Sequence, residues 1–263
     1  MNRWPLAALW MLLLAGAVLN AAERSERYPL NGQSGMRLEA SRASVMVRSG
    51  DVQWIELRVV TVGWKISATE VSVVESHDAH TINFGVRVPA EFFGVGRRGV
   101  QVDLIVPRKL NVAIRTGEGR IMADGLSGDI RLSTGHGRID AQRLSGLLES
   151  FSSDGALQVA GRFDRLSLKT NDGPVVLKIA DGSKMTGPWS IQTGGGSIQI
   201  EAGEKFSADL DAQTGDGSVT VDLPLAVSRQ RGEASLRGKL NGGGEKLVVR
   251  SRDGSIHIGR PML

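Results

Sequence analysis

A short pattern centred on a glycine recurs seven times in the second half of this chain. Its copies read TGEGRIMA (116–123), TGHGRIDA (134–141), SSDGALQV (152–159), TNDGPVVL (170–177), TGGGSIQI (193–200), TGDGSVTV (214–221) and SRDGSIHI (251–258). The glycines that anchor the copies are Gly119, Gly137, Gly155, Gly173, Gly196, Gly217 and Gly254. Internal repetition of this kind predicts an array of similar structural units, and it constrains the fold more than composition does.

The anchor glycines are separated by 18, 18, 18, 23, 21 and 37 residues. This spacing predicts one structural unit for each copy. We interpret the last interval as two units, of which one has lost the pattern.

Four positions around each anchor glycine carry the same kind of residue in every copy. Threonine or serine stands three residues before the glycine, and an apolar residue stands seven before it. Further apolar residues stand two and four residues after it. Polar residues alternate with the apolar ones, which predicts a strand on each side of the glycine. The apolar position before the glycine lies at an odd distance from it, and those after it lie at even distances. The alternation is therefore interrupted, and a turn must lie between the two strands.

The Thr/Ser-x-x-Gly segment is predicted to form this turn. Its hydroxyl group can bond nearby backbone, and we expect the anchor glycine to adopt positive φ. A second turn is predicted half a repeat later, at Gly128 and Gly146. Each unit then consists of two short strands and two turns.

Two all-β architectures satisfy the pattern: a flattened β-solenoid with two-strand coils of about 18 residues, and a chain of antiparallel hairpins. We favour the solenoid, because a constant coil length stacks equivalent positions about 4.8 Å apart and explains why Thr or Ser recurs in register. The predicted core is a stack of Ile, Leu and Val side chains, with a hydroxyl ladder along one edge.

Residues 23–109 are rich in strand signals but lack the regular spacing. We predict two strands around residues 49–51, a hairpin over Glu70–Val88 that turns at His77–His80, a loop over Glu91–Gly99 and a strand over Val100–Pro107. The chain is therefore divided into a signal peptide (1–22), an irregular β-rich part (23–109) and a repeat part (110–263). The irregular part is expected to begin the same sheet system.

The first residues have the features of an export signal. Arg3 precedes the apolar run Leu6–Leu19, and small residues follow. Cleavage is predicted at Ala15-Gly16-Ala17 or at Asn20-Ala21-Ala22. The alternative is a retained anchor, although 14 apolar residues fall short of the roughly 20 that span a bilayer. No second run of this kind follows, so we expect no transmembrane span in the mature chain, and location in the periplasm or at the cell surface.

Composition excludes several classes of function. The chain has no cysteine, which excludes disulfides, thiolate chemistry and lipidation at a cysteine. Its formal net charge is +4, its basic residues are scattered and its aromatic content is 5%. A nucleic-acid partner is therefore not expected. No cofactor is predicted.

Three stretches resemble a known family. They are VDLIVPRKLNVAIRTGEGRI (102–121), LSGDIRLSTGHGRI (126–139) and LRGKLNGGGEKLVVRSRDGSI (236–256). The family is a bacterial domain-of-unknown-function family of β-strand-repeat proteins, also described as candidate adhesins, and the resemblance covers about residues 40–258. It implies an exported or envelope-anchored β-solenoid without known catalytic residues, so no site residue is carried over. The adhesin description is itself an inference from architecture.

Acidic residues stand directly before five of the anchor glycines: Glu118, Asp154, Asp172, Asp216 and Asp253. In a solenoid Asp154 and Asp172 would lie about 5 Å apart, near the carboxylate separation of retaining glycosidases. Stacked carboxylates could also hold calcium. His136 and Gly195 interrupt the series, however, and Asp-Gly is ordinary turn chemistry. We predict neither a catalytic nor a metal site there.

Two other motifs are interpreted as structural. His77 and His80 flank Asp78 at a hairpin tip with no third ligand in view, so no metal site is predicted. Residues 94–99 match Gly-x-Gly-x-x-Gly, but a strand follows where a dinucleotide site needs a helix.

Basic residues at Arg120 and Arg138 occupy equivalent positions in adjacent repeats, and Lys178 lies nearby. They fit a basic strip that faces anionic glycan or lipid, and equally a solvated strand face. Arg97 and Arg98 are predicted to form a solvated loop tip.

We predict a non-enzymatic structural or interaction protein that offers a flat repeat face to an envelope polymer or protein. One alternative is a β-solenoid lyase or hydrolase of polysaccharides, whose mark would be an acidic-basic cluster that breaks the repeat; no such cluster is evident. The other is an accessory protein in envelope-stress signalling. The sequence does not specify the ligand or the oligomeric state.

Overall fold

The computed structural model describes residues 21–89 and 98–261, in which every regular element is a strand. The strands are β1 (Ala21–Pro29), β2 (Gly35–Arg42), β3 (Ser44–Gly50), β4 (Trp54–Val62), β5 (Ser72–His77), β6 (Thr81–Arg87), β7 (Gly99–Pro107), β8 (Asn111–Glu118), β9 (Ile121–Asp124), β10 (Ser127–Thr134), β11 (Ile139–Ser152), β12 (Leu157–Thr170), β13 (Val175–Ile179), β14 (Trp189–Thr193), β15 (Ile198–Ala202), β16 (Ala208–Gln213), β17 (Val219–Val221), β18 (Leu225–Arg231), β19 (Ser235–Leu240), β20 (Lys246–Ser251) and β21 (Ile256–Gly259). The predicted all-β class is confirmed. In the part of the chain that the structure describes, no helix is long and apolar enough to cross a bilayer.

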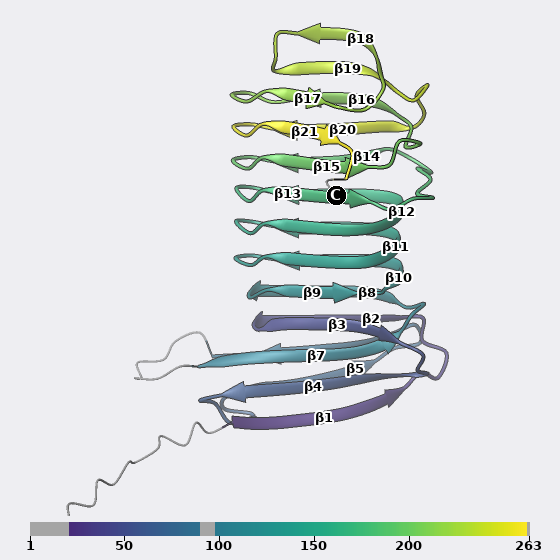
Figure 1. Ribbon diagram of the computed structural model, residues 1–263. Coiled ribbons are helices and arrows are strands. Elements are labelled where there is room, and N and C mark those ends of the chain that lie inside the picture. Colours follow the sequence, from purple (N-terminus) through teal and green to yellow (C-terminus); the bar gives the residue numbers. More distant parts are fainter. Residues whose placement is uncertain (1–20, 90–97, 262–263) are drawn as a thin grey trace, which may run out of the picture.

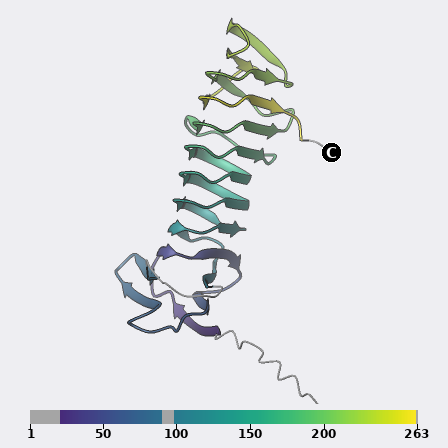
Figure 2. The same cartoon turned by 90° about the vertical axis from the view of Figure 1, so that its left-hand side faces the viewer.

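Most strands stack into two parallel-paired walls that face each other across a common core (Figure 1). The strands β1, β4, β5, β18 and β19 pair antiparallel at the two ends of the stack. The first wall contains β2, β8, β10, the C-terminal parts of β11 and β12, β14, β20 and β16. The second wall contains β3, β9, the N-terminal parts of β11 and β12, β13, β15, β21 and β17. Figure 2 shows the coils lying above one another, with the N-terminal strands at the opposite end from β18.

Register along the second wall follows the repeat. Ile121 pairs with Ile139, which pairs with Leu157, which pairs with Val175, so three consecutive steps keep the spacing of the anchor glycines. The next step joins Val175 to Ile198 and is five residues longer, because residues 180–188 leave the walls before β14 begins. The coils therefore vary in length while their turns stay stacked.

The core consists of the apolar positions that the repeat defines. Those seven residues before the anchor glycine are all buried: Val112, Ile130, Leu148, Leu166, Trp189, Leu210 and Leu247. Trp189 is the largest of them, and its ring packs against Phe206 with centroids 5.6 Å apart. Its indole Nε1 donates to the Asp164 carbonyl at 3.1 Å, which satisfies the one polar atom of this side chain.

The predicted hydroxyl ladder runs along the edge between the two walls. Its members are buried: Thr116, Thr134, Ser152, Thr170, Thr193, Ser251 and Thr214. From Thr134 onward, each hydroxyl donates to the carbonyl of the anchor glycine in the preceding coil of the stack, at 2.8–3.0 Å. Five also accept from the amide of the anchor glycine in their own coil. The ladder thus ties each turn to the next.

Replacing Thr170 by valine is expected to lower the free energy of unfolding by about 1–3 kcal/mol, because it leaves two buried backbone groups without their partner. These groups are the Gly155 carbonyl, 3.0 Å from Oγ1, and the Gly173 amide, 3.2 Å from it. Urea denaturation measures the change, and Thr220→Val on the exposed face of β17 is the matched control. Equal midpoints for the two variants would show that the ladder does not stabilise the fold.

The anchor positions are glycine for a reason different from the one predicted. Only Gly119 among the seven has positive φ, at 129°, so the expected left-handed turn is wrong for the other six. What they share is contact: a Cβ at Gly155 would lie 1.7 Å from the Gly137 carbonyl oxygen, and one at Gly137 would lie 1.9 Å from that of Gly119. The second-turn glycines Gly128 and Gly146 do adopt positive φ. The anchors are glycine because consecutive coils touch there.

The last interval of the repeat is not two coils. Residues 222–245 hold the antiparallel hairpin β18–β19, and β19 pairs with β16 to cap the end of the stack. The coil of Gly254 lies between those of Gly196 and Gly217, because β20 pairs with both β14 and β16 and β21 pairs with both β15 and β17. The interpretation of this interval as two coils, one of them degenerate, was wrong, because the C-terminal coil inserts between two coils that precede it in the sequence.

Asp211 lies where this insertion meets the cap. Its carboxylate is 2.9 Å from Arg250 on the inserted β20 and 3.2 Å from Arg237 on β19. Burial raises the pKa of the Asp211 carboxyl, but the two guanidinium groups outweigh burial and hold the pKa below its usual value. This charged contact ties the inserted coil to the capping hairpin.

The N-terminal end is built in a similar way. The coil of β2 and β3 lies between the strands β6 and β7 on one side and β8 and β9 on the other. The predicted hairpin is β5–β6, and Asp78 closes it by accepting from the amides of His80 and Thr81 at 2.8 and 2.7 Å. The irregular part therefore continues both walls, as expected.

One buried position of the first wall departs from the apolar pattern. Ser150 stands where the neighbouring coils place Leu132 and Leu168, and its hydroxyl has no hydrogen-bond partner among the described residues. Ser150→Ala is expected to raise the free energy of unfolding by about 1 kcal/mol, because an unpaired buried hydroxyl is removed. Ser152→Ala, which breaks two backbone bonds, is expected to lower it. A loss of similar size in both variants would refute the assignment.

Candidate interaction face

The outer face of the first wall is the candidate site. Side chains four residues before the anchor glycines form a row across it, and we call its first four members the central row: Arg115 on β8, Ser133 on β10, Phe151 on β11 and Lys169 on β12. Each is in register with the next along the wall. In-register strands lie about 4.8 Å apart, so three intervals place the backbones of Arg115 and Lys169 about 14 Å from each other.

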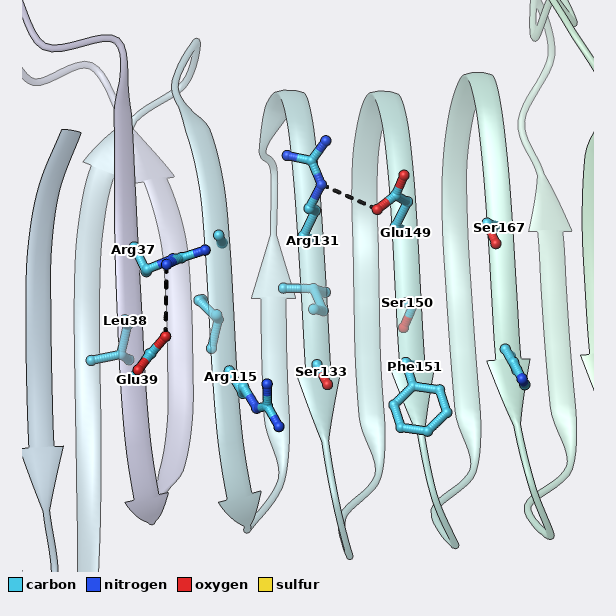
Figure 3. A pocket seen from close by; sticks show the side chains of 14 residues that line it. Arg37, Leu38, Glu39, Arg115, Arg131, Ser133, Glu149, Ser150, Phe151 and Ser167 are labelled. Carbon is cyan, nitrogen blue, oxygen red and sulfur yellow. Dashed lines mark hydrogen bonds and ion pairs between the residues drawn. The ribbon is translucent and has the colours of Figure 1, made fainter. Parts of the chain in front are cut away.

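The charges directly beside the central row are paired with each other. Arg131 lies 3.1 Å from Glu149 across neighbouring strands, and Arg37 lies 3.8 Å from Glu39 along β2 (Figure 3). Arg115 and Lys169 are exposed, and neither has an ion-pair partner among the described residues. The central row therefore carries two positive charges that no ion pair engages, and Glu39, which is in register with Arg115, pairs instead with Arg37.

A groove of about 410 Å³ follows this row over β2, β8, β10, β11 and β12. Four basic and two acidic side chains line it, together with Phe151 and three serines. Phe151 is half-buried and lies on the outer surface between Ser133 and the end of β12 (Figure 3). The arrangement is a shallow, net positive channel with one aromatic surface in its floor.

The acidic turn residues do not form a shared carboxylate site. Asp154 is engaged by the imidazole of His136 in the preceding coil, and Asp253 by its neighbour Arg252. Glu118 pairs with Arg42 of the inserted N-terminal coil at 3.3 Å. No cluster of three metal-ligating side chains occurs within residues 21–89 and 98–261.

The other residues that the sequence analysis singled out lie outside the described residues or in structural contacts and turns. The Gly-x-Gly-x-x-Gly match and Arg97 fall largely outside the described residues, while Arg98 lies over the ring of Trp64, 4.4 Å from its centroid. His77 lies in β5 and His80 in the turn that Asp78 closes.

The basic residues of the second wall that the sequence analysis singled out are paired. Arg138 lies 2.7 Å from Asp140, and Arg120 is 3.7 Å from the same carboxylate. Lys178 lies 3.1 Å from Glu201, whose carboxylate is buried. These pairs leave the hypothesis of a basic strip on this face without support.

The central row was not recognised from the sequence, although a signal for it exists. When the copies are aligned on their anchor glycines, the position four residues earlier holds Arg115, Ser133, Phe151, Lys169, Gln192, Gln213 and Arg250. Phe151 is the one aromatic residue in that outward-facing series. Its exposure and the lack of partners for Arg115 and Lys169 depend on the neighbouring coils, which the sequence does not display.

The comparisons with known proteins identify the family. The Toastrack DUF4097 family model matches residues 34–259, which is most of the chain, and the protein belongs to that family. The predicted resemblance to a bacterial β-repeat family is thereby confirmed. A search of curated proteins finds no match.

Solved structures with similar folds are distant in sequence. A candidate cell-adhesion protein of Clostridium sporogenes is 14% identical, with a TM-score of 0.45 over 92% of this chain and 100% of its own. A candidate adhesin of Bacteroides fragilis is 13% identical, with a TM-score of 0.47 over 91% and 97%. A candidate lipid-binding protein of Parabacteroides distasonis is 10% identical, with a TM-score of 0.31 over 92% and 97%. At these TM-scores the similarities carry no argument about function.

Proposed function

We propose that this chain is an exported, non-enzymatic interaction protein of the bacterial cell envelope, and that it presents the outer face of its first wall to an extended partner. The observation that carries the proposal is the central row, in which two charges without an ion-pair partner and an aromatic side chain lie in register beside a row whose Arg131 and Glu149 pair with each other. A stack of in-register coils repeats its contacts along one axis, which suits a partner that is itself extended.

Three further features support the proposal. The apolar run Leu6–Leu19 after Arg3 supports export. The resemblance described in the sequence analysis implies an adhesin-like role, which supports an interaction function. Two of the acidic turn residues, Asp154 and Glu118, are engaged by basic side chains of other coils, which supports a non-enzymatic role over the polysaccharide-cleaving alternative.

The location is tested by protease treatment of intact cells that produce an epitope-tagged copy, beside lysed and fractionated controls. Loss of the tag from intact cells assigns the protein to the surface and to adhesion. Protection, with release in the periplasmic fraction, assigns it to an envelope partner inside the outer boundary. Recovery in the cytoplasmic fraction alone would overturn the proposal.

Binding is tested separately with isolated cell envelopes. We expect the purified protein to sediment with them and to be released by salt, because the central row is positively charged. A protein that stays in the supernatant at low ionic strength would contradict an interaction role.

A further inference from the structure

The central row combines two kinds of recognition that a solvated strand face does not need. Arg115 and Lys169 supply positive charge at the two ends of the central row, and Phe151 supplies an apolar surface between them. The neighbouring row of the same wall shows the contrasting case, where Arg131 and Glu149 neutralise each other at 3.1 Å. The central row is thus complementary to a ligand that is anionic at intervals and has an apolar face.

We propose that the central row binds a linear acidic polysaccharide that runs along the axis of the stack, across β8, β10, β11 and β12. Carboxylate groups of the glycan pair with Arg115 and Lys169, and the CH-rich face of a sugar ring between them packs on Phe151. Ser133 and Ser167 lie in the groove within reach of the ring hydroxyl groups. This inference rests on the proposed interaction function and names its ligand class.

The geometry favours a glycan over other anions. A sugar ring presents an apolar face and polar edges, and a floor in which one aromatic side chain is flanked by serines matches both. Successive strands are about 4.8 Å apart, close to the length of one sugar unit, so a chain laid across them meets equivalent positions in step. A membrane surface would contact the highest points of a face, whereas Phe151 lies half-buried in the groove.

The test uses alginate, a linear polyuronate, as the probe and measures affinity by calorimetry at several salt concentrations. We expect the wild-type protein to bind alginate, with an affinity that falls as salt rises, and not to bind the neutral polymer dextran. Replacing both Arg115 and Lys169 by glutamine is expected to weaken binding about tenfold or more. Phe151→Ala is expected to weaken it about three- to tenfold without changing the salt dependence.

The matched control removes the same charges elsewhere. Arg48→Gln with Lys184→Gln takes one arginine and one lysine from the second wall and from an exposed loop, and it is expected to change affinity less than about twofold. All substituted side chains lie on the outside of the stack, and unchanged urea midpoints establish that each variant is folded.

Two further probes separate the ligand classes. Poly-glutamate is anionic without sugar rings, and phosphatidylglycerol vesicles present an anionic lipid surface. Binding of either as tight as that of alginate, or unchanged alginate binding by Phe151→Ala, would overturn the glycan assignment. If the triple variant at Arg115, Phe151 and Lys169 still sediments with envelopes, the interaction role stands, but its assignment to the central row and this inference both fail. If the wild-type protein binds neither envelopes nor alginate, both fail.

Discussion

Replacing Gly155 by alanine is expected to lower the free energy of unfolding by more than about 3 kcal/mol, a loss typical of severe overpacking. The new Cβ would lie 1.7 Å from the Gly137 carbonyl oxygen and 2.3 Å from its carbon, and both belong to the backbone of the adjacent coil. Neither atom can move without breaking the bonds that join the stacked turns. The amides two residues after six of the seven anchors donate to the next coil; that of Ile139, for example, donates to the Ala156 carbonyl at 3.0 Å.

Two glycine controls separate contact from backbone strain. Gly187 has ordinary φ and no heavy atom within 4 Å of the position that a new methyl group would take, so Gly187→Ala is expected to be neutral within about 0.5 kcal/mol. Gly232 lies in equally open space but has φ of 58°, so its alanine variant is expected to lose about 1 kcal/mol through strain alone. Urea denaturation should give a far lower free energy of unfolding for Gly155→Ala than for the other two variants. A loss at Gly155 no larger than that at Gly232 would refute close approach as the reason for glycine.

The same glycine shows what the sequence could and could not predict. Period-2 alternation on both sides of the anchors predicted the strands, the buried positions and the hydroxyl ladder, because these depend on local parity and on repetition. The conformation of Gly155 was predicted from turn chemistry, which considers one chain segment at a time. The contact that excludes a side chain comes from Gly137, the anchor of the preceding coil, and it exists only once the coils are stacked.

The order of the coils could not be predicted either. The interval between Gly196 and Gly217 is close to the length of a single coil and suits direct stacking of those two coils. Nothing local shows that a third coil lies between them. The central row was missed for a related reason. A row of outward-facing side chains can be interpreted only when the neighbouring side chains are known. Arg131 is paired with Glu149, whereas Arg115 and Lys169 have no ion-pair partner among the described residues.

Removing residues 245–263 is expected to destabilise the C-terminal third of the molecule by more than about 5 kcal/mol. The truncation deletes β20 and β21, with the four buried side chains Leu247, Val249, Ile256 and Ile258, each of which contributes about 1.5–3 kcal/mol by burial. It also removes Arg250, 2.9 Å from Asp211, so this carboxylate loses one of the two guanidinium groups that hold its pKa below the usual value against the effect of burial. The deleted coil is internal to the stack, so its loss exposes two surfaces.

Limited proteolysis and urea denaturation of the truncated protein measure this effect. We expect cleavage within residues 203–245 under conditions that leave the full chain intact, and an early unfolding step that the full chain lacks. Leu247→Ala is the graded control, since it leaves the coil in place and is expected to lose about 2–5 kcal/mol without a separate step. The contrary result is a truncated protein with a single transition at the original midpoint. That result would mean that β16 and β17 move down one step and pair directly with β14 and β15, as the short interval between Gly196 and Gly217 allows. The inserted coil would then be an extra layer of the stack, and the cap formed by β18 and β19 would hold the end of the molecule without it.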